Sequence, residues 1–496
     1  MDASVIVVGA GPAGLMLAGE LRLAGAGVIL LERLLQPSGE SRGLGFTART
    51  MEVFDQRGLL PRFGEIETGT MGHFGGLPLD LGCLDGRQEA AKVVPQSATE
   101  RVLESWATEL GAEIRRGHEF VGLDDSGDAV AVRVHGPEGE YVLHASYLVG
   151  CDGGRGKVRK AAEFDFPGTE ATAELLLADI RGIELPRRVA GASVSGGMVM
   201  SAPMGDGVSR VILSERGAPP QRRTTPPEFS EVADAWKRLT GADISGAEPI
   251  WVSAFTDAAR QVTQYRRGRV LLAGDAAHIH LPAGGQGMNT SIQDSVNLGW
   301  KLAAVVRRSA PERLLDTYHD ERHPVGQRLL TNARAQGLLI LGGGDMQPLR
   351  DVLSELMDYP DVRRHLAAMV SGLEIRYDMG EGRHPLLGLR MPHLDLTVGG
   401  RATGSTELLR PGRGVLLDLA DNDQLRRRAA DWSARIDIVT ARAPEVPESG
   451  PLAGTSALLL RPDGHVCWTA PGSHGDLRGA LARWFGPPAT TSGTRG

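Results

Sequence analysis

Cysteine is scarce in this chain: among 496 residues only Cys83, Cys151 and Cys467 occur. Three scattered cysteines build neither a disulfide framework nor a cysteine-rich zinc site, and no CxxC pair is present. This usage is typical of a reducing compartment, so we expect a cytoplasmic protein. The first residues run directly into an apolar strand pattern without a basic region, which is unlike a signal peptide.

Long apolar runs and an excess of positive charge are also missing. No run approaches 18 consecutive apolar residues, so we expect no membrane span. The 54 Lys and Arg residues are outnumbered by 61 Asp and Glu residues, which gives a net charge of −7 and argues against nucleic-acid binding. Glycine, in contrast, is abundant, with 66 residues. In an ordered chain such an excess indicates tight turns and close approach of the backbone to a ligand.

The length predicts two to four domains at roughly 100–200 residues each. A strand, a glycine turn, a helix and a second strand within 4–33 form a βαβ pattern, and two long helical patterns cover 288–308 and 312–340. We therefore expect an α/β fold with three domains. They are a Rossmann-like dinucleotide-binding domain (1–170 plus 261–385), a middle β-sheet substrate domain (171–260 with part of 71–97), and a C-terminal thioredoxin-like domain without a redox CxxC (396–496).

The first candidate site is the GAGPAG turn that follows the first strand. In a dinucleotide-binding turn, Gly9 permits the sharp bend, Gly11 lets the backbone approach a pyrophosphate, and Gly14 lets helix and strand pack closely. The helix that begins around Ala13 directs free N–H groups and a partial positive charge at the phosphates. Glu32 ends the second strand, where its carboxylate can accept hydrogen bonds from ribose hydroxyls. The turn alone does not separate FAD from NAD.

The second candidate site lies within 269–289. The buried strand pattern at 268–273 delivers Asp275 to its carboxyl end, where a carboxylate can bind a sugar-alcohol chain such as ribityl. A glycine-rich loop then opens a helix whose N–H groups and dipole suit a developing negative charge, such as that on a reduced flavin ring. The loop and the first helical turn contribute Gly274, Gly285, Gly287, Met288 and Asn289.

Three motifs together resemble the class A flavin-dependent aromatic hydroxylases, the single-component FAD monooxygenases typified by para-hydroxybenzoate hydroxylase. The motifs are GAGPAG with Glu32 and Arg33, the segment 147–159 with Asp152-Gly153, and 274–289 continuing as TSIQDSVNLGWKLA. Within this family the chain is similar to actinomycete polyketide oxygenases, particularly those of angucycline biosynthesis. The resemblance spans the whole chain and implies that the dinucleotide-binding domain binds FAD.

The resemblance also implies roles for further residues. Asp152 matches the family's DG motif, which is associated with both FAD and NADPH. Gly156 stands where a serine is common, so a hydroxyl-mediated role at that position is not expected here. Arg42 matches an arginine near FAD, and Gln96 matches a flavin-proximal glutamine. The pattern from Tyr318 to Pro324 matches a family helix whose role we interpret as structural.

The implied chemistry is hydroxylation of a polycyclic aromatic polyketide with NADPH as transient co-substrate and O₂, through a C4a-hydroperoxide of the flavin. Because the cofactor carries this chemistry, the family requires no nucleophile triad and no metal. His278-x-His280 and His319-x-x-x-His323 lack a clear third ligand, so we expect no metal site. His278 lies beside the flavin loop and either positions substrate or packs behind the loop.

The substrate pocket is expected between the flavin ring and the middle sheet, with the apolar, glycine-rich segments 71–80 and 195–204 as candidate walls. Two alternatives stay open at this point. The first is Baeyer–Villiger oxygenation of a polyketide ketone, and the second is a non-catalytic flavoprotein that binds polyketides. The exact substrate and the oligomeric state do not follow from the sequence.

Overall fold

A computed structural model describes residues 1–84, 90–125, 127–443, 450–472 and 476–489 of the chain. The fold is mixed α/β, and its centre is an eight-stranded sheet with the order β19-β20-β11-β1-β2-β8, to which β10 and β9 are added next to β11. The pairs from β20 through β8 are parallel, whereas β19, β10 and β9 pair antiparallel. The strands are β1 (Ala3–Val8), β2 (Val28–Glu32), β8 (Glu113–Arg116), β9 (Glu119–Asp124), β10 (Val130–Gly136), β11 (Gly139–Gly150), β19 (Arg266–Arg267) and β20 (Val270–Leu272).

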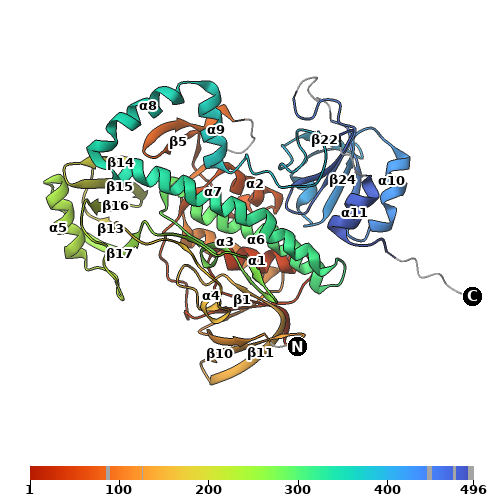
Figure 1. Cartoon of the computed structure of the whole chain (residues 1–496), viewed down its shortest axis with the longest axis horizontal. Coiled ribbons are helices and arrows are strands. Elements are labelled where there is room, and N and C mark those ends of the chain that lie inside the picture. The colour runs from red at the N-terminus through yellow and green to blue at the C-terminus, as the bar shows by residue number, and fades with distance from the viewer. Residues whose placement is uncertain (85–89, 126, 444–449, 473–475, 490–496) are drawn as a thin grey trace, which may run out of the picture.

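Helix α1 (Pro12–Leu23) packs between α3 (Gln96–Glu109) and α6 (Gln286–Val306) on this sheet (Figure 1). Two glycines allow the close approach: a Cβ added to Gly19 would lie 2.1 Å from the Trp106 ring, and one added to Gly299 would lie 2.4 Å from the Glu20 side chain. Since β1, β2, β20 and most of α1 are buried, their sequences read as nearly continuous apolar runs.

The middle of the chain folds into a five-stranded antiparallel sheet with the order β14-β15-β16-β13-β17. The amphipathic helix predicted around Trp236 is α5 (Phe229–Thr240), which covers one face of this sheet through Val232 and Trp236. In Figure 1 this unit lies at the left of the molecule. The strands are β13 (Glu174–Arg181), β14 (Arg188–Val194), β15 (Gly197–Gly205), β16 (Val208–Glu215) and β17 (Glu248–Thr256).

The strands in the described parts of 71–97 do not pair with that sheet, although part of this segment was expected to belong to the middle domain. Strands β5 (Met71–Phe74) and β6 (Leu77–Asp80) form a hairpin of their own, because Phe74 and Leu79 are buried against helices α8 (Gln347–Met357) and α9 (Pro360–Ser371). Strand β7 (Ala90–Pro95) pairs instead with β3 (Leu44–Phe46) and β4 (Thr68–Gly69).

Helix α2 (Ala48–Gln56) follows β3, and α4 (Lys157–Ala161) follows β11. A further small sheet joins β12 (Gly168–Thr169), β18 (Ala259–Gln261) and β21 (His278–Ile279).

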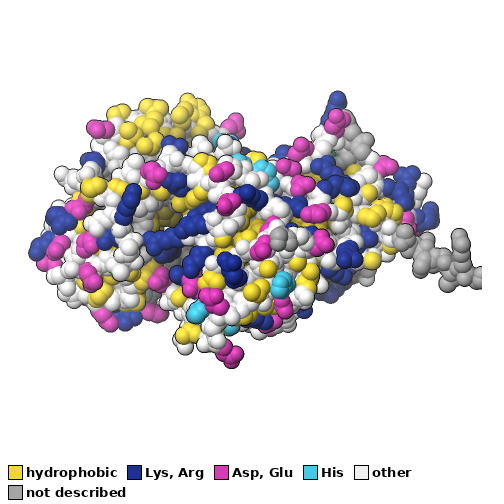
Figure 2. Space-filling model, turned by 60° about the horizontal axis from the view of Figure 1, so that its bottom comes forward, with side chains coloured by type: hydrophobic (Ala, Val, Ile, Leu, Met, Phe, Trp, Pro, Cys, Tyr) yellow, Lys and Arg dark blue, Asp and Glu magenta, His cyan; other side chains and the backbone are white. Residues whose placement is uncertain are grey.

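The two long helical patterns are confirmed as α6 and α7 (Asp316–Leu341), which lie side by side across the centre of Figure 1. After α7 come α8 (Gln347–Met357) and α9 (Pro360–Ser371). Helix α8 turns Leu349, Val352 and Leu356 outward, and hydrophobic side chains gather at the upper left of Figure 2. Elsewhere on that face, Lys and Arg side chains are interspersed with Asp and Glu.

The C-terminal residues form a four-stranded sheet with the order β25-β24-β26-β27, in which only the β24–β25 pair is parallel. Its elements are β24 (Gly414–Asp418), α10 (Asp423–Ala429), β25 (Ile436–Thr440), β26 (Ala457–Leu460), β27 (Val466–Ala470) and α11 (Leu477–Phe485); β22 (Asp395–Val398) and β23 (Arg401–Gly404) form a hairpin before them. No helix in the described part of the chain is long and apolar enough to cross a membrane.

Buried charges join this C-terminal unit to the main body. Arg57, after α2, contacts Glu20 of α1 at 2.5 Å and donates to the backbone carbonyls of Leu409 (3.1 Å) and Pro462 (2.8 Å). Both charged side chains are almost fully buried. A buried pair of this kind contributes little to net stability while intact, but removing one partner leaves an uncompensated charge.

We expect Arg57→Met to lower the free energy of unfolding by about 3–5 kcal/mol, because Glu20 is left buried without its counter-charge. Thermal unfolding measures the effect as a lower midpoint. The double variant Glu20→Gln, Arg57→Met is the control and recovers part of the loss. A single variant with the wild-type midpoint would contradict this assignment.

Candidate functional site

The predicted motifs converge at the carboxyl edge of the parallel strands. The chain leaves β1 at Gly9, β2 at Glu32 and β11 at Cys151, and backbone hydrogen bonds tie these ends together: Gly9 N donates to Leu31 O (2.8 Å), and Cys151 N donates to Val8 O (2.8 Å). The end of β20 joins them because Ala273 N donates to Gly150 O (3.0 Å). In open α/β sheets, ligands bind outside this edge.

The three glycines of the first turn differ in what surrounds them. Gly9 has φ +105°, and a Cβ added there would lie 2.5 Å from Cys151 O. A Cβ on Gly14 would lie 1.9 Å from Gly9 O. Gly11, in contrast, faces open space, with no described atom within 4 Å of an added Cβ. Gly9 and Gly14 thus close the turn, while Gly11 leaves the N-terminus of α1 accessible to a ligand.

Glu32 is held in place by the backbone around it. Its Oε2 accepts from Ala10 N (2.8 Å) in the glycine turn, and Oε1 accepts from Leu34 N (2.9 Å). The carboxylate therefore borders the turn at the end of β2. Arg33 beside it is exposed.

Asp152 and Arg159 organise the loop after β11. Oδ2 of Asp152 accepts from Val158 N (3.0 Å) at the start of α4, and burial raises the pKa of this carboxyl. Arg159 is buried and donates to Gly154 O (2.8 Å) and Ala276 O (2.8 Å). The guanidinium thus links the Asp152 loop to the turn after β20. The motif 147–159 includes Arg159, but the spacing of its residues does not show that Arg159 contacts Ala276.

The turn after β20 projects Asp275 outward. Gly274 has φ +63° and is enclosed by Ser291 and Ala13, at 2.9 and 3.1 Å from an added Cβ. Asp275 itself is exposed and makes no hydrogen bond within the described chain, so its carboxylate is available to a ligand. His278 is fully buried, and its Nε2 donates to Asp294 (2.8 Å). Of the two roles considered for His278, the structure favours packing behind the loop.

The N-terminus of α6 lies beside two segments that are distant in sequence. Gly285, in the left-handed region at φ +66°, precedes the helix, and Gly287 lies in its first turn. Asn289 Oδ1 accepts from Thr47 N (2.9 Å) before α2. Met288 contacts Gly43, at 3.2 Å from an added Cβ, and Gly43 N donates to Gln96 Oε1 (3.2 Å).

Gln96 thereby lies near the start of α6 through Gly43, and Arg42, next to Gly43, is exposed; their predicted places beside the flavin stay predictions. The sequence pattern places Thr47 at the start of a helix but does not show its hydrogen bond to Asn289, which depends on the contact between α2 and α6.

These features fit an FAD molecule. A dinucleotide needs helix N–H groups for its phosphates and carboxylates for its sugar hydroxyls, and the isoalloxazine ring needs donors for developing negative charge. Gly11 and Gly285 each leave open space beside a helix N-terminus, and the exposed Asp275 offers a free carboxylate.

Comparison with known families agrees with this geometry. Residues 2–333 match the family described as an FAD binding domain. Residues 384–488 match the aromatic-ring hydroxylase C-terminal family. The chain belongs to the FAD-dependent aromatic-ring hydroxylases. The enzyme therefore uses FAD, and the expected family is confirmed over nearly the whole chain.

Individual relatives narrow the comparison. The enzyme is 44% identical to a 12-dehydrotetracycline 5-monooxygenase/anhydrotetracycline 6-monooxygenase of Streptomyces rimosus, over 99% of this chain and 100% of the relative. Among solved structures it is similar to CabE, an aromatic hydroxylase from angucycline biosynthesis (65% identity, TM-score 0.97, 98% of this chain and 100% of CabE). It is also similar to BexE, studied for oxidation during BE-7585A biosynthesis (69% identity, TM-score 0.95, 98% and 100%).

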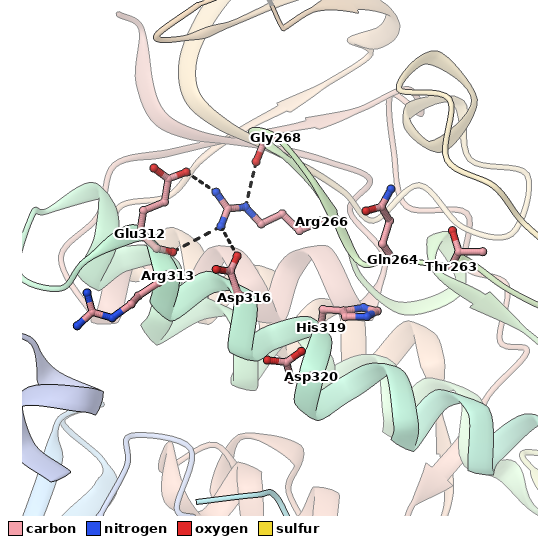
Figure 3. Close-up of a pocket in the computed structure, with 9 residues that line it drawn as sticks. All are labelled: Thr263, Gln264, Arg266, Gly268, Glu312, Arg313, Asp316, His319 and Asp320. Atoms are coloured by element: carbon pink, nitrogen blue, oxygen red, sulfur yellow. Dashed lines mark hydrogen bonds and ion pairs between the residues drawn. The ribbon is translucent and has the colours of Figure 1, made fainter. Parts of the chain in front are cut away.

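Two surface cavities lie apart from the glycine turn. One of about 780 Å³ opens beside the amino end of β20, where Figure 3 shows Arg266 pointing between Glu312 and Asp316. A second of about 510 Å³ lies among α6, α7 and α9 and reaches Asn289. In the first cavity Arg266 is already paired with Glu312 and Asp316, and neither cavity is lined by residues of the glycine turn, so the carboxyl edge remains the better candidate site.

A matched pair of substitutions tests the open position in the glycine turn. Gly11→Val keeps allowed backbone angles, and a Cβ there has no described atom within 4 Å, yet the side chain would fill the space assigned to the pyrophosphate. We expect a wild-type unfolding midpoint for the FAD-free protein and a loss of FAD affinity of about 100-fold or more, measured by flavin fluorescence titration.

Gly246→Val, at another open glycine outside the site, serves as the control and should bind FAD normally. Normal FAD affinity in Gly11→Val would show that the pyrophosphate lies elsewhere.

Proposed function

We propose that this enzyme is a single-component monooxygenase that hydroxylates a polycyclic aromatic polyketide of the angucycline type, with NADPH and O₂. The observation that carries this proposal is the similarity to CabE, which covers the whole of that angucycline hydroxylase at 65% identity. The open glycine positions at the carboxyl edge, Gly11 and Gly285, support the proposal, because a flavin hydroxylase needs a site that holds FAD.

The proposed FAD contacts follow the geometry of the edge. The N–H groups at the start of α1, around Ala13, hold the pyrophosphate, and Glu32 accepts from the ribose. Asp275 accepts from the ribityl hydroxyls, and Gly287 through Asn289 face the flavin ring. Arg42, Gln96 and the Asp152 loop border the same space, and exposed Arg33 lies beside the ribose site.

When bound, FAD supplies the transfer of an oxygen atom from O₂ to the aromatic ring. The chain's own residues orient and shield this chemistry. The dipole of α6 stabilises negative charge next to its first turn. Backbone N–H donors that are already fixed in place need little reorganisation when charge develops in a site that excludes water.

The middle sheet offers a face for a flat substrate. Strand alternation directs Val199 toward α5 but turns Met198 and Met200 toward Leu281 and Ala283 of the flavin loop. The segment 195–204 thus supplies an apolar wall opposite the proposed flavin position. Polarisable methionine side chains adapt to fused aromatic rings. The hairpin at 71–80 would form a second wall.

The same proposal includes the division into an FAD-binding domain (1–170 plus 261–385), a middle sheet domain and a thioredoxin-like C-terminal domain. The strand order β25-β24-β26-β27 with α10 and α11 supports the last assignment. We also keep the expectation of a cytoplasmic protein, which depends on the cysteine usage.

The decisive assay offers the purified holoenzyme a panel of phenolic polycyclic polyketides. We expect at least one angucycline-type phenol to increase NADPH oxidation and O₂ uptake and to gain one oxygen atom, with the carbon skeleton intact by NMR. A product with a ring-expanded skeleton would show that the reaction is Baeyer–Villiger oxygenation and not hydroxylation. If no compound stimulates NADPH oxidation, the monooxygenase proposal fails and a binding role is favoured.

A substitution on the sheet tests the substrate face separately. Met200→Trp adds bulk to the half-buried wall, so the KM for the polyketide should rise about tenfold or more while the FAD dissociation constant stays unchanged. Val142→Trp, at an exposed position of β11, is the control. An unchanged KM in Met200→Trp would place the substrate elsewhere.

A further inference from the structure

One buried carboxylate connects the proposed FAD site to the interior of the protein. Asp294 of α6 is fully buried and lies directly behind the turn after β20. Its Oδ2 accepts from Gly274 N (3.2 Å) and from His278 Nε2 (2.8 Å). The carboxylate therefore holds both ends of the short segment that presents Asp275 to the ligand side.

A buried arginine fixes that carboxylate. Arg322 of α7 donates from Nε to Asp294 Oδ1 (2.6 Å) and also donates to the carbonyl oxygen of Thr290 (3.3 Å). Burial by itself would raise the pKa of Asp294, but the charges of Arg322 and His278 outweigh it, so the pKa lies below its ordinary value. Asp294 is thus held as an anion, which accepts hydrogen bonds on both oxygens.

The chain of contacts continues toward the C-terminal unit. A guanidinium nitrogen of Arg322 donates to the hydroxyl oxygen of Tyr377 (3.0 Å), in the segment that leads away from α9. The Tyr377 ring packs on His465, with ring centroids 4.2 Å apart, and its backbone N donates to Gly388 O (3.0 Å).

The neighbouring residue of α7 makes a second connection. Glu321 accepts from Arg461 at 2.5 and 2.8 Å and from Lys301 at 2.8 Å. Arg461 also pairs with Asp463, and all four charged side chains are buried. Helix α7 is therefore anchored to the C-terminal unit at the same turn that carries Arg322, which restricts the position of the guanidinium.

We propose that Asp294 is a positioning residue for the FAD-binding turn Gly274-Asp275, and that Arg322 and Tyr377 hold it in place from the side of the C-terminal unit. The C-terminal unit thereby supports FAD binding without a residue in contact with FAD. This inference depends on the proposed contact between Asp275 and FAD, which the experiment must test on its own.

The experiment compares substitutions that change few atoms. Asp294→Asn keeps the shape of the side chain but replaces an acceptor oxygen by a donor group facing Arg322 or Gly274. Tyr377→Phe removes only the hydroxyl that accepts from Arg322. The matched controls are Asp179→Asn, at a buried Asp–Arg pair of the middle sheet, and Tyr141→Phe, whose hydroxyl also accepts from an arginine.

The readouts are the FAD dissociation constant of each apoprotein, the visible spectrum of the bound flavin and the unfolding midpoint without FAD. We expect the dissociation constant to rise about tenfold or more in Asp294→Asn and about threefold in Tyr377→Phe, with an altered flavin band. Both controls should remain within about twofold of wild type, even where their midpoints fall.

Wild-type FAD affinity and flavin spectra in both Tyr377→Phe and folded Asp294→Asn would overturn the proposal. Losses of FAD affinity no larger than those of equally destabilised controls would also overturn it. If Asp294→Asn does not fold, Tyr377→Phe alone decides between these outcomes. Asp275→Ala tests the contact beneath the inference. Normal FAD binding in Asp275→Ala would show that FAD does not contact Asp275. Weak FAD binding in Asp275→Ala together with normal FAD binding in Asp294→Asn would overturn only the positioning role of Asp294.

Discussion

The termination of four parallel strands at one edge of the sheet is the constraint on which the rest of the structure depends. Strands β1, β2, β11 and β20 are distant in sequence, yet their carboxyl ends are joined by backbone hydrogen bonds. A residue at the end of such a strand, or within three positions after it, must lie at that edge. This geometry collects Gly9, Glu32, Asp152 and Asp275 into one region and leaves the helix N-termini of α1 and α6 to receive an anionic ligand.

Much of this arrangement could be predicted from the sequence because it is encoded locally. The glycine turn, the acid after the second strand and the strand before Asp275 each follow from short patterns of residue type. The roles of Gly9, Gly11 and Gly14 also follow, since a tight turn and an open backbone position have few solutions. Similarity to CabE and to the tetracycline oxygenase then agreed with the function that the motifs implied.

The contacts that cross between elements could not be predicted in this way. Helical periodicity places Asp294 on α6, but only the packing of α6 on β20 shows that it accepts from Gly274. The same holds for Thr47 with Asn289 and for Arg159 with Ala276. Part of 71–97 was expected to belong to the middle domain, whereas the burial of the hairpin at 71–80 against α8 and α9 determines its position. In each case a long-range contact decides the role of a residue whose local pattern is ambiguous.

FAD binding at the carboxyl edge is the central claim, and a crystal structure of the FAD complex tests it most directly. We predict the pyrophosphate within hydrogen-bond distance of the N-terminus of α1, the ribityl chain at Asp275, and the flavin ring against Gly287 through Asn289. FAD with its pyrophosphate away from Gly11, or lying wholly in the cavity among α6, α7 and α9, would contradict this claim.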